Sequence, residues 1–294
     1  MASSDDAPHY GIFYRYCKYI NIYEKEFDEM VSKHPEIINH IYDNGDSPLE
    51  MACIDDNRRL LTKLLELGVE IYNHPFIKHI ILRTIELKRV NIFYSFMNDF
   101  KLDLKSVFHG EAILCEILKN HNNSWASMIF IDSGVDIFIR DKSGNSALYH
   151  AFGIRDLNAI EKLIELGADM YETIKCCDCE KLTTFLHKAC ILHDYQLMYI
   201  FIDKGFDVNT IDYNGDTSLT SVMLSDLHIL NKIDIMNFLL QLGADPSIPN
   251  NSGLSILSFI MNENESYSPE IAKKLLFNTW NIEISPSTKR QRTE

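Results

Sequence analysis

The sequence predicts an all-α protein in which helix pairs are stacked as a repeat solenoid. One short phrase recurs with two apolar residues, a variable pair and a glycine, and its glycines stand at 68, 134, 167, 205 and 243. A second glycine stands at 45, 110, 144, 215 and 253, each four residues before a leucine. Two linked markers at near-constant intervals are typical of stacked helical repeats, and about seven to eight units would fill the chain.

The intervals also locate copies that have lost the glycine. The step from Gly68 to Gly134 is twice the step from Gly134 to Gly167, which predicts a hidden copy near position 101, and 96–103 keeps the apolar pair with Lys101 in place of glycine. Degenerate terminal copies follow at 30–36 and 275–280, as is usual at the ends of repeat arrays. The predicted units span 10–42, 43–72, 73–104, 105–140, 141–173, 174–211, 212–249 and 250–280, between a disordered N-terminus at 1–9 and a disordered basic tail at 281–294.

Each unit is expected to run turn, helix, helix, turn. The first glycine and the apolar residues after it predict a tight turn that leads into a short amphipathic helix, and the second glycine ends the second helix in a left-handed conformation. The residues expected to cap the first helices are Ser47, Ser146, Thr217 and Ser255. The residues expected in the core are Leu49, Ala52, Leu64, Leu148, Ala151, Leu163, Leu186, Ala189 and Leu239. Lys78 and Leu182 occupy turn-glycine positions, so irregular turns are expected there.

Segments 43–52, 141–151 and 184–189 resemble the opening D-x-x-G-x-T-P-L-H-x-A motif of ankyrin repeats, and the recurring phrase resembles that family's L-L-x-x-G-A-D. From these motifs the chain is identified as a member of the ankyrin-repeat family over roughly residues 10 to 280. Its Ile-, Asn- and Asp-rich, diverged repeats are most similar to those of large DNA viruses, poxviruses above all. Many poxvirus ankyrin proteins add a C-terminal F-box-like segment, and none is expected here. The resemblance also implies that His187 is structural.

The resemblance implies a non-catalytic protein-interaction module that uses the turns between units and the concave face of the first helices. Candidate contact residues are Arg140, Lys142, Asn145, Tyr149, Phe152, Tyr213, Asn214, Asn250 and Asn251. Tyr149 and Phe152 have an alternative place packed between units. The expected function is that of a viral host-range or immune-modulating factor that neutralises a host protein. The alternative is a cellular regulator that masks a basic partner segment, as the cytoplasmic inhibitors of NF-κB do.

Composition narrows the class of partner. The formal net charge of −14 argues against nucleic acid, because phosphate binding draws on clustered Lys and Arg, and it favours a protein partner. No long apolar run predicts a membrane span or a secretory signal. Seven cysteines, an odd number, indicate reduced thiols in the cytoplasm. The basic cluster Lys289, Arg290 and Arg292 predicts either nuclear import or a solubilising tail. A monomer is expected.

The sequence gives little support for catalysis or metal binding. Cys176, Cys177, Cys179 and His193 could together bind zinc, but their spacing matches no paired C-x-x-C framework, so neither a metal nor another cofactor is expected. No nucleophile, phosphate-loop or metalloprotease motif occurs, and the chain is not expected to be an enzyme. The repeated carboxylates Glu66, Asp132, Glu165 and Asp203 indicate a solvated face.

Two insertions lengthen the repeat to 38 residues, near 175–181 and near 225–234. Extra residues in a solenoid usually enter loops, often on a binding face. The second insertion has an alternative place as an added helical turn, in which Leu227, Ile229 and Leu230 would be buried.

Overall fold

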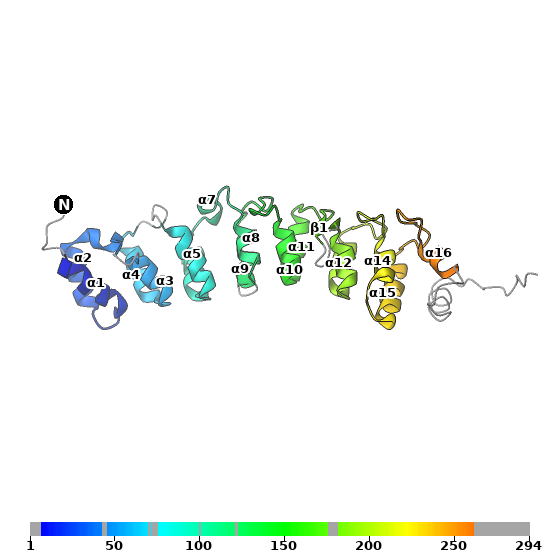
Figure 1. The fold of residues 1–294 in the computed structure, drawn as a ribbon. Helices are drawn as coiled ribbons and strands as arrows, with labels where there is room; N and C mark the ends of the chain where they lie inside the picture. Colours follow the sequence, from blue (N-terminus) through cyan, green and yellow to red (C-terminus); the bar gives the residue numbers. More distant parts are fainter. Residues whose placement is uncertain are drawn as a thin grey trace, which may run out of the picture. The chain divides into compact units, whose positions relative to one another are not determined.

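The computed structural model is a succession of short helix pairs joined by long turns (Figure 1). It describes residues 7–42, 46–69, 71, 76–99, 101–120, 123–175 and 182–261. The chain divides into two units, Met1–Ala159 and Ile160–Glu294. Among the described residues, no helix is long and apolar enough to cross a membrane.

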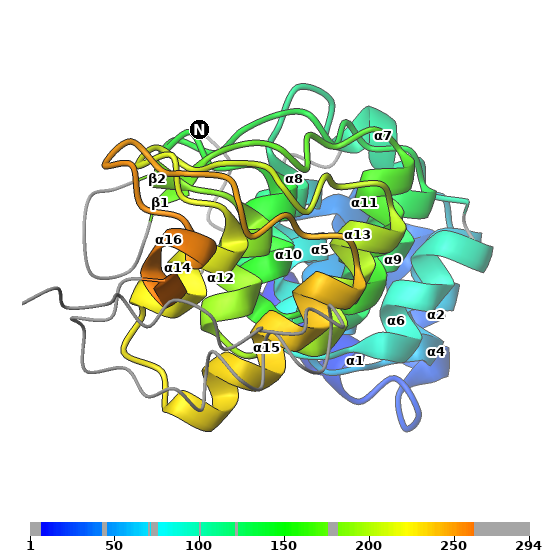
Figure 2. The same cartoon turned by 90° about the vertical axis from the view of Figure 1, so that its right-hand side faces the viewer.

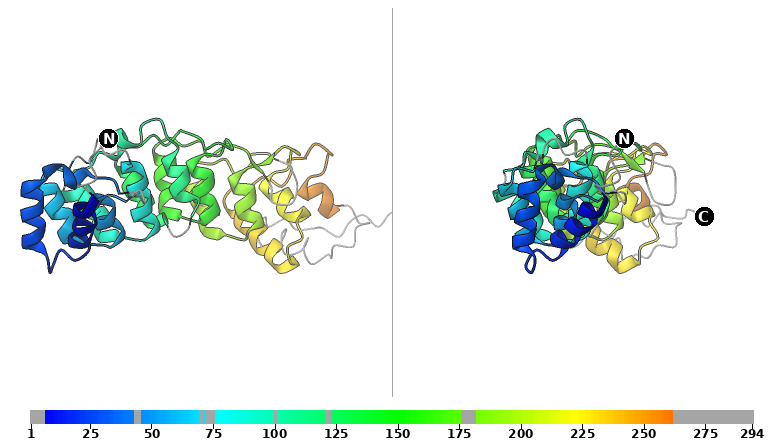
Figure 3. Two further views of the ribbon diagram at one scale, coloured as in Figure 1. Left: turned by 60° about the vertical axis from the view of Figure 1, so that its left-hand side comes forward. Right: turned by 90° about the vertical axis from the view of Figure 1, so that its left-hand side faces the viewer.

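Unit 1 contains the first four predicted repeats and the first part of the fifth, up to the start of α11. Its elements are α1 (Ala7–Lys18), α2 (Glu24–Lys33), the 3-10 helix η1 (Pro35–Asn39), α3 (Pro48–Ile54), α4 (Arg58–Glu66), α5 (Ile77–Glu86), α6 (Val90–Tyr94), the π-helical turn η2 (Ser95–Asp99), α7 (Leu104–Val107), α8 (Ile113–Leu118), α9 (Ser124–Asp132) and α10 (Ala147–Ile154). Helix α1 packs against α2 and α3 (Figure 3). It begins at Ala7, so the predicted disordered terminus at 1–9 is wrong for its last three residues.

Unit 2 contains most of α11 (Leu157–Glu165), strands β1 (Ile174–Lys175) and β2 (Leu182–Thr183), and helices α12 (Phe185–Ile191), α13 (Tyr195–Asp203), α14 (Ser218–Leu224), α15 (Ile229–Gln241) and α16 (Ile256–Met261). Helix α12 packs against both α13 and α14, and α14 packs against α15 and α16 (Figure 2). Helices therefore recur through the part of the chain that the structure describes, and the class of fold is the predicted all-α ankyrin-repeat one.

The repeating sequence markers have the conformations that the pattern predicts. Among the described turn and phrase glycines φ is positive throughout, from +74° at Gly110 to +92° at Gly167, and Lys101 adopts the same left-handed region with φ +48°. Ser47, Ser146 and Thr217 accept hydrogen bonds from the backbone N–H three residues on, which caps α3, α10 and α14. All nine predicted core residues are at most 1% exposed.

The final Asp of the recurring phrase closes a second turn. The backbone N–H groups of Tyr171 and Asn209 each donate to the carboxylate two residues earlier, at 2.9 Å. Their side chains then reach the backbone of the following repeat. The Tyr171 hydroxyl donates to the Gly205 carbonyl and accepts from the Asp207 N–H, both at 3.2 Å. Asn209 makes the same bridge to Gly243 at 3.3 Å and Asp245 at 2.7 Å. We call Tyr171 and Asn209 the bridging residues.

The two insertions behave differently. The first lies between β1 and β2, which pair antiparallel with Ile174 opposite Thr183, and its residues 176–181 are outside the described part. The turn-glycine position at Leu182 is therefore a strand residue.

The second insertion lengthens α15 to 13 residues, where α4, α9, α11 and α13 have nine. An added helical turn is confirmed, but the burial predicted with it is wrong, because Leu230 is 54% exposed and Leu227 and Ile229 are only half-buried.

Candidate protein-interaction surface

The turns between repeats are built around one carboxylate or amide each. Asp141 accepts the N–H groups of Ser143 and Asn145 at 2.8 and 2.9 Å, while its own N–H donates to the Asn145 carbonyl at 3.0 Å. Asp212 and Asn250 organise the later turns in the same way. These internal bonds fix the backbone of the tip turns, by which we mean residues 140–145, 211–216 and 249–254, before any partner arrives.

The four asparagines predicted as contact residues are engaged within the tip turns. Asn145 bonds Asp141 through its backbone N–H, as described above, and Asn214 donates its N–H to Asp212 at 2.8 Å. The Asn250 amide donates to Asp216 at 2.7 Å, and the Asn251 amide donates to the Tyr213 carbonyl at 3.2 Å. Their role in holding the turns is visible. Their role as partner contacts stays a prediction.

The aromatic and basic candidates divide by exposure. Tyr213 is 73% exposed, and Ile211 on the same tip turn is 53% exposed. Arg140 and Lys142 are exposed, and Arg140 Nη1 donates to the Gly144 carbonyl at 3.0 Å.

Tyr149 is half-buried and lies edge-on to His150, with ring centroids 5.4 Å apart. Phe152 is 7% exposed, so its prediction as a contact residue is wrong and its alternative place, packed inside the repeats, is the one the structure shows.

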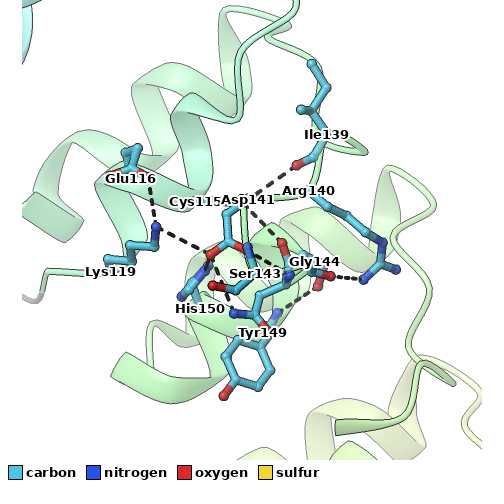
Figure 4. Close-up of polar contacts among 12 residues, drawn as sticks. Cys115, Glu116, Lys119, Ile139, Arg140, Asp141, Ser143, Gly144, Tyr149 and His150 are labelled. Carbon is cyan, nitrogen blue, oxygen red and sulfur yellow. Dashed lines mark hydrogen bonds and ion pairs between the residues drawn. The ribbon is translucent and has the colours of Figure 1, made fainter.

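A charged cluster lies beneath the tip turn of unit 1 (Figure 4). Asp141 Oδ2 lies 2.9 Å from Nε2 of His150 and 3.3 Å from Nζ of Lys119, whose ammonium also pairs with Glu116 at 2.8 Å. We call Glu116, Lys119, Asp141 and His150 the Asp141 cluster. The Asn145 N–H, together with His150, Ser143 and Lys119, holds the pKa of Asp141 well below its usual range. The hydrogen bond to Glu116 raises the pKa of Lys119.

Sequence reasoning missed this cluster, because its members come from two different repeats and are not periodic. The only signal was the Asp that opens the D-x-x-G turn. Asp141 has all its near partners within the protein and stays ionised, so it is poorly suited to move a proton. The Asp141 cluster therefore positions the tip turn by connecting it to α10 and to the end of α8.

His187 is structural, as predicted. It is fully buried, its Nδ1 lies 2.7 Å from the Thr184 hydroxyl, and its Nε2 lies 2.8 Å from the Asp216 carbonyl in the next tip turn. Burial lowers the pKa of this imidazole. Cys115 occupies the equivalent position in its own repeat, where its thiol lies 3.6 Å from the carbonyls of Ile139 and Asn145.

The described thiols are poor nucleophiles. Burial raises the pKa of Cys115 to about 11 and that of Cys190 to about 12, so both remain protonated near neutral pH.

Of the four candidate zinc ligands, the structure describes only His193. His193 lies at the turn after α12, and its Nε2 is 3.1 Å from the Tyr195 hydroxyl. The seven residues of α12, about 10 Å of helix, separate it from β2. Cys176, Cys177 and Cys179 are outside the described residues, as are Lys289, Arg290 and Arg292 of the tail. Among the residues that the structure describes, no group of three or more His, Cys, Asp or Glu could hold a metal.

Stacked helix pairs, left-handed glycines at both turns and the buried histidine that reaches the next turn are the features of an ankyrin-repeat fold. Repeats of this fold are typical of protein-protein interaction modules. No family model matches it. A similar curated protein is "Putative ankyrin repeat protein FPV034" of Fowlpox virus (strain NVSL), 26% identical over 206 residues, which are 70% of this chain and 41% of that protein. The poxvirus-like character of the repeats is thus confirmed.

Two plant proteins share shorter stretches. The ADP-ribosylation factor GTPase-activating protein AGD4 of Arabidopsis thaliana is 37% identical over 83 residues, 28% of this chain and 10% of that protein. The potassium channel AKT2/3 of the same plant is 29% identical over 118 residues, 40% of this chain and 13% of that protein. The matched regions span less than half the length of all three relatives.

Among solved structures, the ankyrin repeat domain of Bcl-3, titled a unique member of the IkappaB protein family, aligns with a TM-score of 0.52. The alignment covers 79% of this chain and 98% of that domain at 20% identity. At this identity the likeness shows the shared fold alone.

Proposed function

We propose that this protein is a viral host-range or immune-modulating factor that captures and neutralises a host protein without catalysis of its own. The observation that carries the proposal is Tyr213, which is 73% exposed on a tip turn whose backbone is fixed by internal hydrogen bonds. A large side chain on a rigid turn loses little conformational entropy when it binds. The likeness to a fowlpox ankyrin protein supports the viral assignment.

Each unit offers its own contact residues. In unit 1, Arg140 and Lys142 present positive charge on an otherwise acidic protein. In unit 2, Tyr213 and Ile211 present apolar surface. Aromatic residues and Arg dominate the binding energy of many interfaces. For unit 2 the matching partner surface carries an apolar pocket for Tyr213, and for unit 1 it carries carboxylates for the two cations.

A second candidate function follows from the net charge of −14, which favours a basic partner segment over an acidic one. In that function the protein masks such a segment of a cellular transcription factor. Salt dependence separates the two candidates, because attachment through the whole acidic surface weakens steeply with ionic strength, whereas binding centred on Tyr213 weakens little.

The test is affinity purification of the tagged full chain from expressing cells, with bound proteins identified and quantified by mass spectrometry. Lys142→Glu and Tyr213→Ala are each expected to lower recovery of the specific partner by about ten-fold, the effect of losing about 1.4 kcal/mol of binding energy. The matched controls are Lys25→Glu on α2 and Tyr94→Ala on α6, both at exposed positions away from the tip turns.

Circular dichroism of each variant should match the wild type. If the tip variants recover the partner as well as the two controls do, the binding surface lies elsewhere and the proposal fails.

A further inference from the structure

Unit 2 exposes large apolar side chains at the end of the repeats opposite to the tip turns. They surround the turns that join α12 to α13 and α14 to α15, and they are Leu192 (55% exposed), Tyr195 (36%), Tyr199 (58%), Leu224 (53%) and Leu230 (54%). Because α12 packs beside α14, the two turns lie at the same end of unit 2 (Figure 2). Helix α13 also meets α15, where the rings of Tyr195 at the start of α13 and Phe238 in the last turn of α15 lie edge to face with centroids 5.2 Å apart. We call these five residues the α13–α15 patch.

The second insertion helps to create this surface. Its extra residues precede the recurring phrase, so α15 starts earlier in the repeat and begins with Ile229 and Leu230. The added turn does not cover a core, since Leu230 is more than half exposed. Clustered exposed apolar side chains mark interaction sites, whereas single ones are ordinary on a protein surface.

The charges beside the patch are mainly acidic. Asp226 and Asp234 are exposed, and the carboxylate of Asp234 raises the pKa of Tyr195, in addition to the larger effect of burial. Asp194 begins α13 and accepts the N–H groups of Gln196 and Leu197.

Lys232, near the start of α15, is turned inward. It is 6% exposed, and its Nζ donates to the Met223 carbonyl at 2.8 Å. Burial lowers the pKa of Lys232. The apolar centre therefore has the exposed carboxylates Asp226 and Asp234 beside it, while Lys188 on α12 is half-buried.

We propose that the α13–α15 patch binds a basic amphipathic helix of a partner protein. Tyr195 and Tyr199 are one helical turn apart on α13, and Leu224 and Leu230 flank the neighbouring turn, so the patch offers rows of apolar side chains to the apolar face of a helix. Lys and Arg on the border of that helix would lie near Asp226 and Asp234, which selects a basic helix over an acidic one. This surface is separate from the tip turns and does not depend on the function proposed for them.

The test uses the full chain and a fluorescently labelled amphipathic peptide of leucine and lysine, about five helical turns long. Its partner peptide has glutamate at every lysine position. Fluorescence anisotropy should show saturable binding of the lysine peptide and at least ten-fold weaker binding of the glutamate peptide. The double variant Leu224→Ser/Leu230→Ser should weaken the lysine peptide at least ten-fold, and Asp226→Asn/Asp234→Asn should weaken it and reduce its salt dependence.

Matched controls separate this surface from general stickiness and from the tip turns. Leu166→Ser changes a leucine that is 45% exposed elsewhere in unit 2, and Tyr213→Ala changes the tip turn. Both should bind the lysine peptide as the wild type does, and all variants should keep the wild-type circular dichroism spectrum. The proposal is overturned if Leu166→Ser weakens binding as much as the double variant.

The proposal is also overturned if the wild type binds neither peptide and sedimentation shows a dimer that Leu224→Ser/Leu230→Ser dissociates. The occupant of the patch is then a second copy of this chain.

Discussion

Replacing His187 with leucine tests whether a buried imidazole joins consecutive repeats of unit 2. The substitution keeps an apolar side chain in the core but removes the contacts of 2.7 Å to Thr184 and 2.8 Å to the Asp216 carbonyl. A hydrogen bond contributes about 1 kcal/mol net to the free energy of unfolding, and a buried polar group that loses a partner costs more than that. The Asp216 carbonyl keeps one backbone donor, Asp212, so the expected loss is about 2 kcal/mol in the free energy of unfolding.

The same residue makes stability depend on pH. Burial lowers the folded-state pKa of His187 below the ordinary value of about 6.5, so below pH 6.5 the unfolded chain takes up a proton that the folded chain does not. The contribution of the neutral imidazole is complete above about pH 6.5. It falls with pH, by at most about 1.4 kcal/mol per unit, until the folded-state pKa is reached. His187→Leu should lack this part of the pH dependence.

Urea unfolding followed by circular dichroism between about pH 5 and pH 8 measures both effects. His109→Leu, a change at an exposed histidine, is the control and should reproduce the wild-type midpoints at every pH. If His187→Leu unfolds with the wild-type dependence on pH below 6.5, the imidazole is not buried neutral in the folded protein and the reasoning is refuted.

Three further stability changes can be measured in the same way. Gly215→Ala should cost at least about 2 kcal/mol more than Gly253→Ala, because both glycines have φ +75° but the new methyl at 215 would lie 2.6 Å from the Asn251 side chain and 2.8 Å from its backbone nitrogen. Equal losses would mean that the tip turn carrying Asn251 can move away from residue 215 without a cost in free energy. Asn209→Ala should cost about 1 kcal/mol by removing a bridging residue, and no loss would mean that water replaces the bridge. Lys101→Gly should stabilise by about 1 kcal/mol, since φ is +48° there; a decrease would show that the lysine side chain matters more than the backbone.

The periodic part of this structure could be predicted from the sequence. Caps such as Ser146, core residues such as Leu148 and left-handed glycines recur at fixed spacing. Backbone geometry alone therefore assigns each of these positions to a helix cap, the core or a turn. The Asp141 cluster could not be predicted, because Lys119 and His150 meet Asp141 only once two helices and a turn have packed. The exposure of Leu230 could not be predicted from the sequence either, because an inserted helical turn is buried only if the neighbouring helices are long enough to cover it.

The bridging residues Tyr171 and Asn209 direct their hydrogen bonds to main-chain groups of the repeat that follows, and the Tyr171 ring also stacks on Phe206 with centroids 4.5 Å apart. A tyrosine and an asparagine, unlike in size and shape, therefore make the same main-chain bridge, and these hydrogen bonds place no demand on the side chains of the repeat that accepts them. Such joints let a lineage exchange or diversify repeats quickly while the array stays intact. Rapid change of the partner-facing residues is what the function proposed above, capture of a host protein, would require.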